Sequence, residues 1–211
     1  MTTGNLVGQL LSRHPIISEQ IGRPALTTVL SQLERVLAQD MAGDIVEFGC
    51  YIGTTTLFLR RILQHYDPGG VRQLYAYDSF SGLPPKSTPD ISGAGEQFQG
   101  GELSVSKKQF LQVFRKAGLA PPITVKAWFK DIKAEQLPAA ISFAFLDGDF
   151  YESIIDSLRI VWPRLADGGV ITVDDYQRPA LPGVERAVRD FFRDKSIHLH
   201  HEHNIAVIRR R

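Results

Sequence analysis

The stretch DIVEFGCYIGTTT, residues Asp44–Thr56, has the pattern of a buried strand that turns at two glycines into a helix. The apolar run from Asp44 to Gly49 predicts the strand, and Thr54 opens a row of threonines suited to cap the helix that follows. Gly49 and Gly53 let the backbone approach a ligand closely. Because ligands of open α/β sheets bind beyond the carboxyl ends of the strands, this turn is a candidate cofactor site.

The carboxylate of Glu47, two residues before the first glycine, bears on the kind of cofactor. Nicotinamide dinucleotides favour Gly-x-Gly-x-x-Gly around a pyrophosphate, whereas this turn reads Gly49-x-x-x-Gly53 with bulky Tyr51 inside it. S-adenosyl-L-methionine has no phosphate and carries an ammonium group beside a sulfonium, so a nearby acid suits it. The turn therefore predicts S-adenosyl-L-methionine. A strand-end acid bonded to neighbouring amides is the structural alternative for Glu47.

Two further residues belong to this candidate site. Asp78 ends the next predicted strand, in LYAYDSF, where a carboxylate can accept hydrogen bonds from both ribose hydroxyls. Cys50 is expected to be a small packed residue whose backbone lines the turn, without a reactive thiolate.

The rest of the chain alternates strands with helices, which predicts a mostly parallel sheet covered on both faces. We expect one domain over residues 1–211, in which residues 1–40 form a helical cover and the end, HLHHEHNIAVIRR, forms a hairpin turning near Glu202–Asn204. The predicted strands are Asp44–Gly49, Gln73–Ser79, Ile123–Phe129, Ser142–Asp147 and Val170–Tyr176. The predicted helices are Pro24–Ala38, Thr54–Tyr66, Ser106–Ala117, Tyr151–Leu165 (stopped by Asp167-Gly168-Gly169) and Gly183–Phe192.

Composition excludes several classes of function. A formal net charge of +1 argues against nucleic acid or a membrane as partner, and no window reaches the apolar length of a membrane span. One cysteine fits a reducing compartment, and the first residues lack the pattern of a signal peptide, so we expect a cytoplasmic protein.

The segment Phe80–Val105 stands apart, since 12 of its 26 residues are Gly, Pro or Ser. A connection of this length without regular structure is usually a lid or an insert. Because it leaves the carboxyl end of a strand, we expect a lid over the site, with an idle surface loop as the alternative.

Carboxylates follow two neighbouring strands, in FLDGDFYES and ITVDDYQRP. Asp147, Asp174 and Asp175 are expected to converge at one edge of the sheet, where they would repel each other unless a cation lies among them. Hard oxygen ligands suit Mg²⁺ or Ca²⁺. Asp149 is a candidate fourth ligand or a helix cap. The alternative is that each aspartate separately fixes a turn or a helix end.

At these residues the sequence resembles class I S-adenosylmethionine-dependent methyltransferases, and more narrowly the macrocin O-methyltransferase family. The matching segments are VEFGCYIGTTT, LYAYDSFSGLPP, VKAWFKDI, FAFLDGDFYES and GGVITVDDY. The resemblance implies a Rossmann-like, seven-stranded, mostly parallel α/β sheet with an antiparallel C-terminal strand. It also implies methyl transfer to a hydroxyl of a small molecule, such as a sugar diol or a catechol-like acceptor, and usually Mg²⁺ held by Asp147, Asp174 and Asp175.

The resemblance further implies cofactor contacts at Glu47, at the turn Gly49–Gly53 with Cys50, Tyr51 and Thr54, at Asp78 with Ser79, at Phe129 with Lys130, and at Asp147. Catechol-type relatives carry a lysine base shortly after the first metal aspartate, but GDFYES has none. If the terminal hairpin turns at the crevice, His201 and His203 come within reach as the base, beside Asp147 as a catalytic residue. Solvated histidines on an exposed edge are the alternative.

Other functions stay open at this point. An NAD(P)-dependent oxidoreductase and a non-catalytic S-adenosylmethionine-binding module are the rival hypotheses. A homodimer is also open, because the helix carrying Leu26, Leu30, Leu33 and Leu37 could cover the sheet or form a dimer face.

Overall fold

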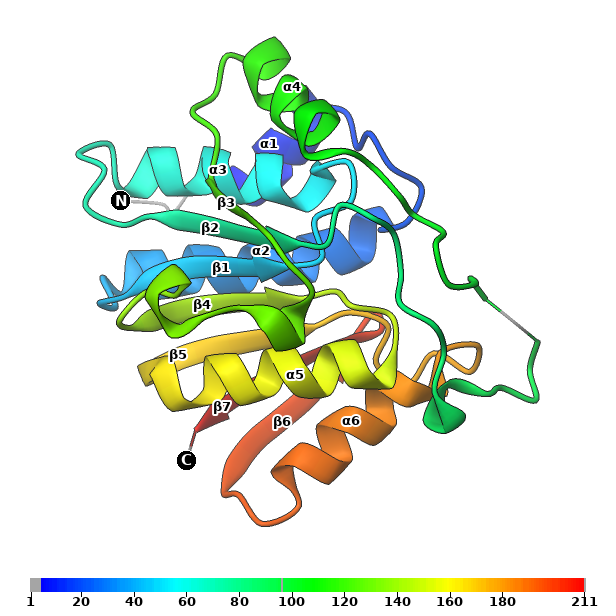
Figure 1. Cartoon of the computed structure of the whole chain (residues 1–211). Helices are drawn as coiled ribbons and strands as arrows, with labels where there is room; N and C mark the ends of the chain where they lie inside the picture. The colour runs from blue at the N-terminus through cyan, green and yellow to red at the C-terminus, as the bar shows by residue number, and fades with distance from the viewer. Residues whose placement is uncertain (1–4, 96, 211) are drawn as a thin grey trace.

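The structure is a computed structural model that describes residues 5–95 and 97–210. Its centre is a seven-stranded sheet in the order β3-β2-β1-β4-β5-β7-β6 (Figure 1). The first five of these are parallel, whereas β7 runs antiparallel to both of its neighbours. The strands are β1 (Asp44–Phe48), β2 (Leu74–Asp78), β3 (Ile123–Lys126), β4 (Ile141–Leu146), β5 (Leu165–Val173), β6 (Ile197–Glu202) and β7 (Ile205–Arg210).

Helices cover both faces of this sheet (Figure 1). One apolar core joins α1, α2 and α3 to the sheet, and another joins α5 and α6 to the opposite face. All six residues of the central strand β4 are buried, as expected for a parallel strand covered on both sides. The helices are α1 (Leu6–Arg13), α2 (Arg23–Ala38), α3 (Thr54–Tyr66), α4 (Lys107–Ala117), α5 (Tyr151–Val161) and α6 (Pro182–Phe192).

The predicted α/β class and the alternation of elements are confirmed. In α2 the side chains of Leu26, Leu30 and Leu33 are fully buried within the chain, at the helical spacing expected from the sequence. That stripe covers the sheet, so it is not the dimer face that the sequence left open. In α4, Ser106 is the N-cap, and its hydroxyl oxygen accepts a hydrogen bond from the Gln109 amide.

The predicted boundaries around β5 are wrong. α5 ends at Val161, a 3-10 turn containing Pro163 follows, and β5 already begins at Leu165. Asp167-Gly168-Gly169 therefore lies inside β5 instead of stopping a helix. The register with β4 shifts there, and Gly168 adopts φ +77°, which accommodates the extra residues as an irregularity of the strand. β5 ends at Val173, so Asp174 and Asp175 belong to the following loop.

The predicted third strand is also too long, because β3 stops at Lys126 and Phe129–Asp131 forms a 3-10 turn. The terminal hairpin is confirmed: β6 and β7 are joined at His203 and Asn204, which have φ angles of 52° and 64°. The Tyr176 amide donates to the Asn204 carbonyl, so this turn lies beside the carboxyl end of β5. Among residues 5–95 and 97–210, no helix combines the length and apolar character needed to cross a membrane.

Candidate active site

A cavity of about 560 Å³ opens at the carboxyl ends of the central strands, within the usual size of a ligand pocket. Gly49 follows β1, Asp78 ends β2, Asp147 follows β4 and Asp175 follows β5, and all four line this cavity. A smaller recess of about 30 Å³ shares Gly49 and Asp147 with it and extends to Glu47. The cavity thus lies at the carboxyl ends of the strands, where the sequence predicts the ligand-binding site.

The glycine turn brings two strand ends into direct contact. Gly49 has φ +88°, and a Cβ built on it would lie 1.8 Å from the carbonyl oxygen of Asp147. Gly53 has φ +89° and packs closely against the ring of Phe110. Both glycines are therefore required by the local structure, although Gly53 lines neither ligand space.

Asp78 fixes the turn through hydrogen bonds. Its Oδ2 accepts from the amides of Cys50 at 2.8 Å and Tyr51 at 3.2 Å, while its Oδ1 accepts from the Phe80 amide at 2.7 Å. Each carboxylate oxygen has two acceptor sites, so the side chain, which lines the cavity, keeps capacity for a ligand hydroxyl.

Glu47 is 1% exposed, and its Oε2 has no hydrogen-bond partner among the described residues. Burial raises the pKa of its carboxyl to about 8, so the side chain is mostly protonated at neutral pH in the absence of a cation. A buried acid without a full set of partners beside a recess is an arrangement that favours a positively charged ligand group.

The other predicted cofactor residues divide between the two spaces. Tyr51, Ser79, Phe129 and Lys130 line the large cavity, and Cys50 and Thr54 line the recess. Burial raises the pKa of the Cys50 thiol well above its usual value, in agreement with an unreactive packed residue.

Several lining residues were not predicted. Arg178 comes three residues after Asp175, and Glu152 and Asp156 lie one helical turn apart on α5, shortly after Asp149. Their positions just after the predicted acidic residues could have identified them. Gln20 lines both spaces from the segment between α1 and α2. No local pattern marks Gln20, because only the folded chain brings it to the site.

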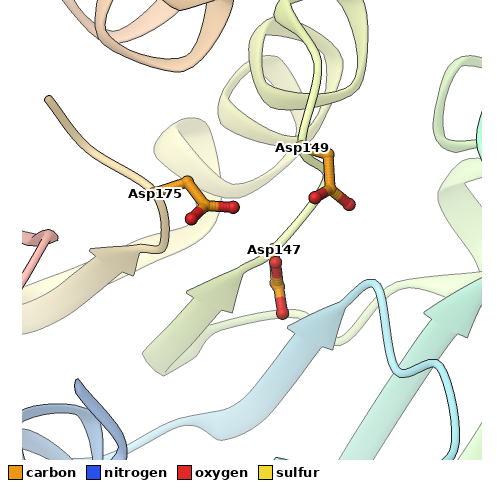
Figure 2. Close-up of side chains that lie close together, drawn as sticks. All are labelled: Asp147, Asp149 and Asp175. Carbon is orange, nitrogen blue, oxygen red and sulfur yellow. The ribbon is translucent and has the colours of Figure 1, made fainter. Parts of the chain in front are cut away.

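Three carboxylates gather on one side of the cavity. One oxygen each from Asp147, Asp149 and Asp175 lies within 4.8 Å of the others, around a common space (Figure 2). Asp149 and Asp175 have φ angles of 59° and 56°, a backbone conformation that non-glycine residues adopt at a cost. The loops after β4 and β5 are thus held in strained conformations that bring the acids together.

Electrostatics in this group favour the uptake of a cation. Burial, followed by the charge of Asp174, raises the pKa of Asp147 well above its usual value. Burial, followed by the charge of Asp175, does the same for Asp149. Arg178 offsets part of the charge of this group, because its Nη1 lies 2.6 Å from Asp175 Oδ1. The oxygen donors therefore fit a hard divalent ion.

Asp174, the other predicted ligand, lies beside this group, since its charge helps to raise the pKa of Asp147, and its role as a ligand stays a prediction. The Asp174 Oδ1 accepts a hydrogen bond from the amide of Asp175 at 2.9 Å, and burial raises its pKa to about 8. Asp149, the candidate fourth ligand, belongs to the three-carboxylate group, and the first amide of α5 donates to Asp90 instead of to Asp149.

The two histidines proposed as bases lie outside the cavity. The His203 Nδ1 is 3.2 Å from the hydroxyl of Thr28 on α2, and the His201 ring lies 5.8 Å from that of Tyr176. Both side chains are exposed, and neither lines the ligand spaces. The hairpin does turn at the expected end of the sheet, but β7 and β6 extend it away from the acids.

Residues 13–208 match the family model described as macrocin O-methyltransferase (TylF). The chain belongs to the macrocin O-methyltransferase family. Among its curated relatives, an 8-demethyl-8-(2,3-dimethoxy-alpha-L-rhamnosyl)-tetracenomycin-C 4'-O-methyltransferase of Streptomyces olivaceus is 32% identical over 81% of this chain and 66% of the relative. Demethyldecarbamoylnovobiocin O-methyltransferase of Streptomyces niveus is 29% identical over 74% of this chain and 61% of the relative.

Solved structures share the fold of this family member. The O-methyltransferase NovP superposes with a TM-score of 0.78 at 26% identity, over 90% of this chain and 81% of NovP. CalS11, a calicheamicin methyltransferase, has a TM-score of 0.71 at 21% identity, over 97% of this chain and 90% of CalS11, and supports the fold alone. The chain spans about two thirds or less of the length of the two curated relatives above.

Proposed function

We propose that this protein is an S-adenosyl-L-methionine-dependent O-methyltransferase that acts on a hydroxyl of a sugar-bearing or catechol-like small molecule, with a divalent metal ion. One observation carries the proposal: a single cavity has the glycine turn with Asp78 on one side and three converging carboxylates on the other. That cavity has room and chemistry for a cationic cofactor and for an acceptor beside it.

The family and its members support the type of reaction. The names of both relatives describe O-methyl transfer, and that of the Streptomyces olivaceus enzyme includes a rhamnosyl group on a polycyclic compound. An acceptor with a free hydroxyl on a sugar or an aromatic ring is the class that these relatives suggest for this chain.

The side of the cavity formed after β1 and β2 binds and orients the cofactor in this proposal. S-adenosyl-L-methionine, when bound, supplies a methyl group activated by the sulfonium. Asp78 and Phe129 both line the cavity, and in this proposal Asp78 accepts hydrogen bonds from the ribose hydroxyls while Phe129 contacts the adenine. Glu47 offers the ammonium group an acceptor, and that positive charge would lower the raised pKa of the carboxyl.

The acid side aligns the acceptor and takes its proton. Asp147 lines both the large cavity and the recess, so it lies where the two ligands would meet. Ionised Asp147 is the proposed acceptor of the hydroxyl proton, and a cation bound beside it would lower its raised pKa and favour the ionised form. Alignment of the hydroxyl with the methyl group accounts for much of the rate enhancement in such a displacement.

Asp147, Asp149 and Asp175, with Asp174 beside them, would hold the metal ion. Mg²⁺ or Ca²⁺ at this position would supply positive charge that lowers the pKa of a nearby acceptor hydroxyl. With the ion absent, Arg178 supplies part of that charge through its pair with Asp175.

The proposal is tested by binding and by turnover. Calorimetry is expected to detect S-adenosylhomocysteine binding and no NADH binding. Transfer of a tritiated methyl group is expected to at least one acceptor of a panel of aryl rhamnosides and catechols, with Mg²⁺ present and not after chelation with EDTA. Tight NADH binding, or no S-adenosylhomocysteine binding, contradicts the cofactor assignment. Full turnover in EDTA contradicts the metal assignment.

A further inference from the structure

The segment between β2 and α4 is closed at its neck by backbone hydrogen bonds. The Gly101 amide donates to the Leu83 carbonyl at 2.8 Å, and the Leu83 amide donates to the Glu102 carbonyl at 2.9 Å. Gly82, with φ +85°, allows this approach, since a Cβ there would lie 2.4 Å from the Gly101 carbonyl oxygen. The two ends of the segment are thus fixed to each other, beside the carboxyl ends of the strands (Figure 1).

Asp90 fixes the same segment to α5. This side chain is 2% exposed, and its Oδ1 accepts from the Tyr151 amide at 2.7 Å. Its Oδ2 accepts from the amide and the hydroxyl of Ser87, at 2.9 and 2.7 Å. Tyr151 is the first residue of α5, whose amide has no partner within the helix, and a carboxylate is favoured at that end of a helix.

The contact extends to α6 on the other side. Gly183 lies in the first turn of α6, and a Cβ built on it would lie 1.8 Å from the Asp90 Oδ1. Any side chain at position 183 would therefore collide with the Asp90 carboxylate. The Ser92 hydroxyl donates to the Pro179 carbonyl at 2.7 Å. The Asp90 carboxylate therefore fits between the first turns of α5 and α6 and attaches the segment to both helices.

The anchored segment contributes to the cavity. Leu83, Pro84 and Pro85 line it, between the closed neck and Asp90. On the other side of the anchor, Tyr151 lies two residues after Asp149, which belongs to the carboxylate group. One buried side chain thus connects the apolar wall of the cavity to the acid side.

We propose that Asp90 is a positioning residue, which fixes this segment as a permanent wall of the acceptor space and holds the turn that carries Asp149. This inference is an alternative to the lid expected from the sequence, which stays a prediction. It rests on the proposed function only for the identity of the ligand, because the anchoring itself is a property of the unliganded chain.

Hydrogen–deuterium exchange on the full chain tests the anchoring. In Asp90→Ala, the amides of Leu83, Gly101 and Tyr151 are expected to exchange at least about tenfold faster than in the wild type, while the β4 amides are unchanged. Asp90→Asn keeps an oxygen that can accept from Tyr151 and is expected to restore most of the protection at that amide.

Gly183→Ala tests the same contact from the opposite side. Alanine is the better helix former, so a purely local effect would stabilise α6. We expect instead that it displaces Asp90 and increases exchange in the segment as Asp90→Ala does. Asp67→Ala is the matched control, since Asp67 likewise accepts from two loop amides, those of Val71 and Arg72, outside the cavity lining.

The effect of Asp90 on acceptor binding is tested by separate measurements. With whichever acceptor of the panel turns over, Asp90→Ala is expected to raise KM at least about tenfold and to leave the S-adenosylhomocysteine Kd within about threefold, with recovery in Asp90→Asn. Unchanged exchange in both Asp90→Ala and Gly183→Ala overturns the proposal. Rapid exchange of the wild-type segment also overturns it. Loss of cofactor binding in the wild type would contradict the proposed function and leave the exchange result standing.

Discussion

The two sides of the cavity differ in how their carboxylates are satisfied. On the β1–β2 side, Asp78 accepts three backbone amide hydrogen bonds, so the protein itself compensates its charge. On the β4–β5 side, Asp147, Asp149 and Asp175 face one another, and an ion pair from Arg178 to Asp175 offsets part of their charge. The charge of Asp78 is thus compensated without a ligand, whereas the acids of the second side gain most from a cation.

This difference in hydrogen bonding and charge compensation affects the stability of the two sides differently. A satisfied carboxylate stabilises the turn that surrounds it, whereas buried carboxylates that crowd one another destabilise the chain unless a cation binds among them. Substitutions on the two sides are therefore expected to differ in sign as well as in size.

The largest effect is expected where the two sides touch. Gly49→Ala would place a methyl group against the carbonyl of Asp147 at a φ of +88°. We expect the free energy of unfolding to fall by at least about 3 kcal/mol, measured by urea denaturation. Gly70→Ala is the control, since Gly70 has φ +69° with nothing within 4 Å, and about 1 kcal/mol is expected there. Equal losses at the two positions would show that φ alone decides.

A second substitution separates the members of the acid group. Asp149→Ala is expected to lower methyl transfer at least about 100-fold, because it removes a proposed ligand to the cation, and to leave S-adenosylhomocysteine affinity within about threefold. Asp174→Ala is expected to lower activity less if its hydrogen bond to the amide of Asp175 is its main role. The reverse order would make Asp174 the more important ligand of the two. Calorimetry with Mg²⁺ provides the readout independent of activity.

The stability of the metal-free, cofactor-free protein is expected to depend on pH with a definite sign. Glu47 and Asp174 have pKa values of about 8 in the folded chain, above those of ordinary carboxyls. The folded state therefore binds more protons, and stability is fully present below the unfolded pKa and is lost as pH rises toward 8.

Glu47→Gln tests that sign, because the amide is neutral at every pH. Between pH 6 and pH 7.5, the fall in unfolding free energy is expected to be smaller than in the wild type by about 2 kcal/mol. Urea denaturation at the two pH values gives the comparison. Saturating Mg²⁺ should reduce the remaining slope, since it favours the ionised acids, and a wild-type stability that rises over this range would refute the explanation.

The smallest effect is expected at the histidines of the hairpin. Because His201 and His203 lie outside both ligand spaces, alanine at either position is expected to leave kcat within about twofold. The pH–rate profile should also keep its shape. Loss of the limb near neutral pH in either variant would return these residues to the role of general base.

Local patterns were sufficient for most of the fold. Leu26, Leu30 and Leu33 have the spacing of a buried helix face, and the apolar run before Gly49 is typical of a buried parallel strand. Both elements lie where the sequence predicts them. The end of α5 was missed because Asp167-Gly168-Gly169 reads as a stop signal, whereas pairing with β4 makes it an irregular part of β5. Tertiary pairing overrode the local preference there.

The site was predictable in its location and less so in its members. Asp147 and Asp175 follow strands, so the sheet order places them together. Asp149, the candidate fourth ligand, lies with them through a backbone conformation with positive φ that no residue pattern specifies. Gln20 and Asp90 reach the site or its wall from distant segments, and Gly183 could be explained only after its contact with Asp90 was known.

Arg178 has a consequence for how the chain matures. Its amide donates to the Asp175 carbonyl, and its guanidinium pairs with the same residue, so one short turn carries both an acid and its counter-charge. In some small metal-binding domains the ion itself supplies the free energy of folding. Because this chain carries its own counter-charge, we expect it to fold before the proposed dication binds, so that removal of Mg²⁺ would be reversible and would not cause misfolding.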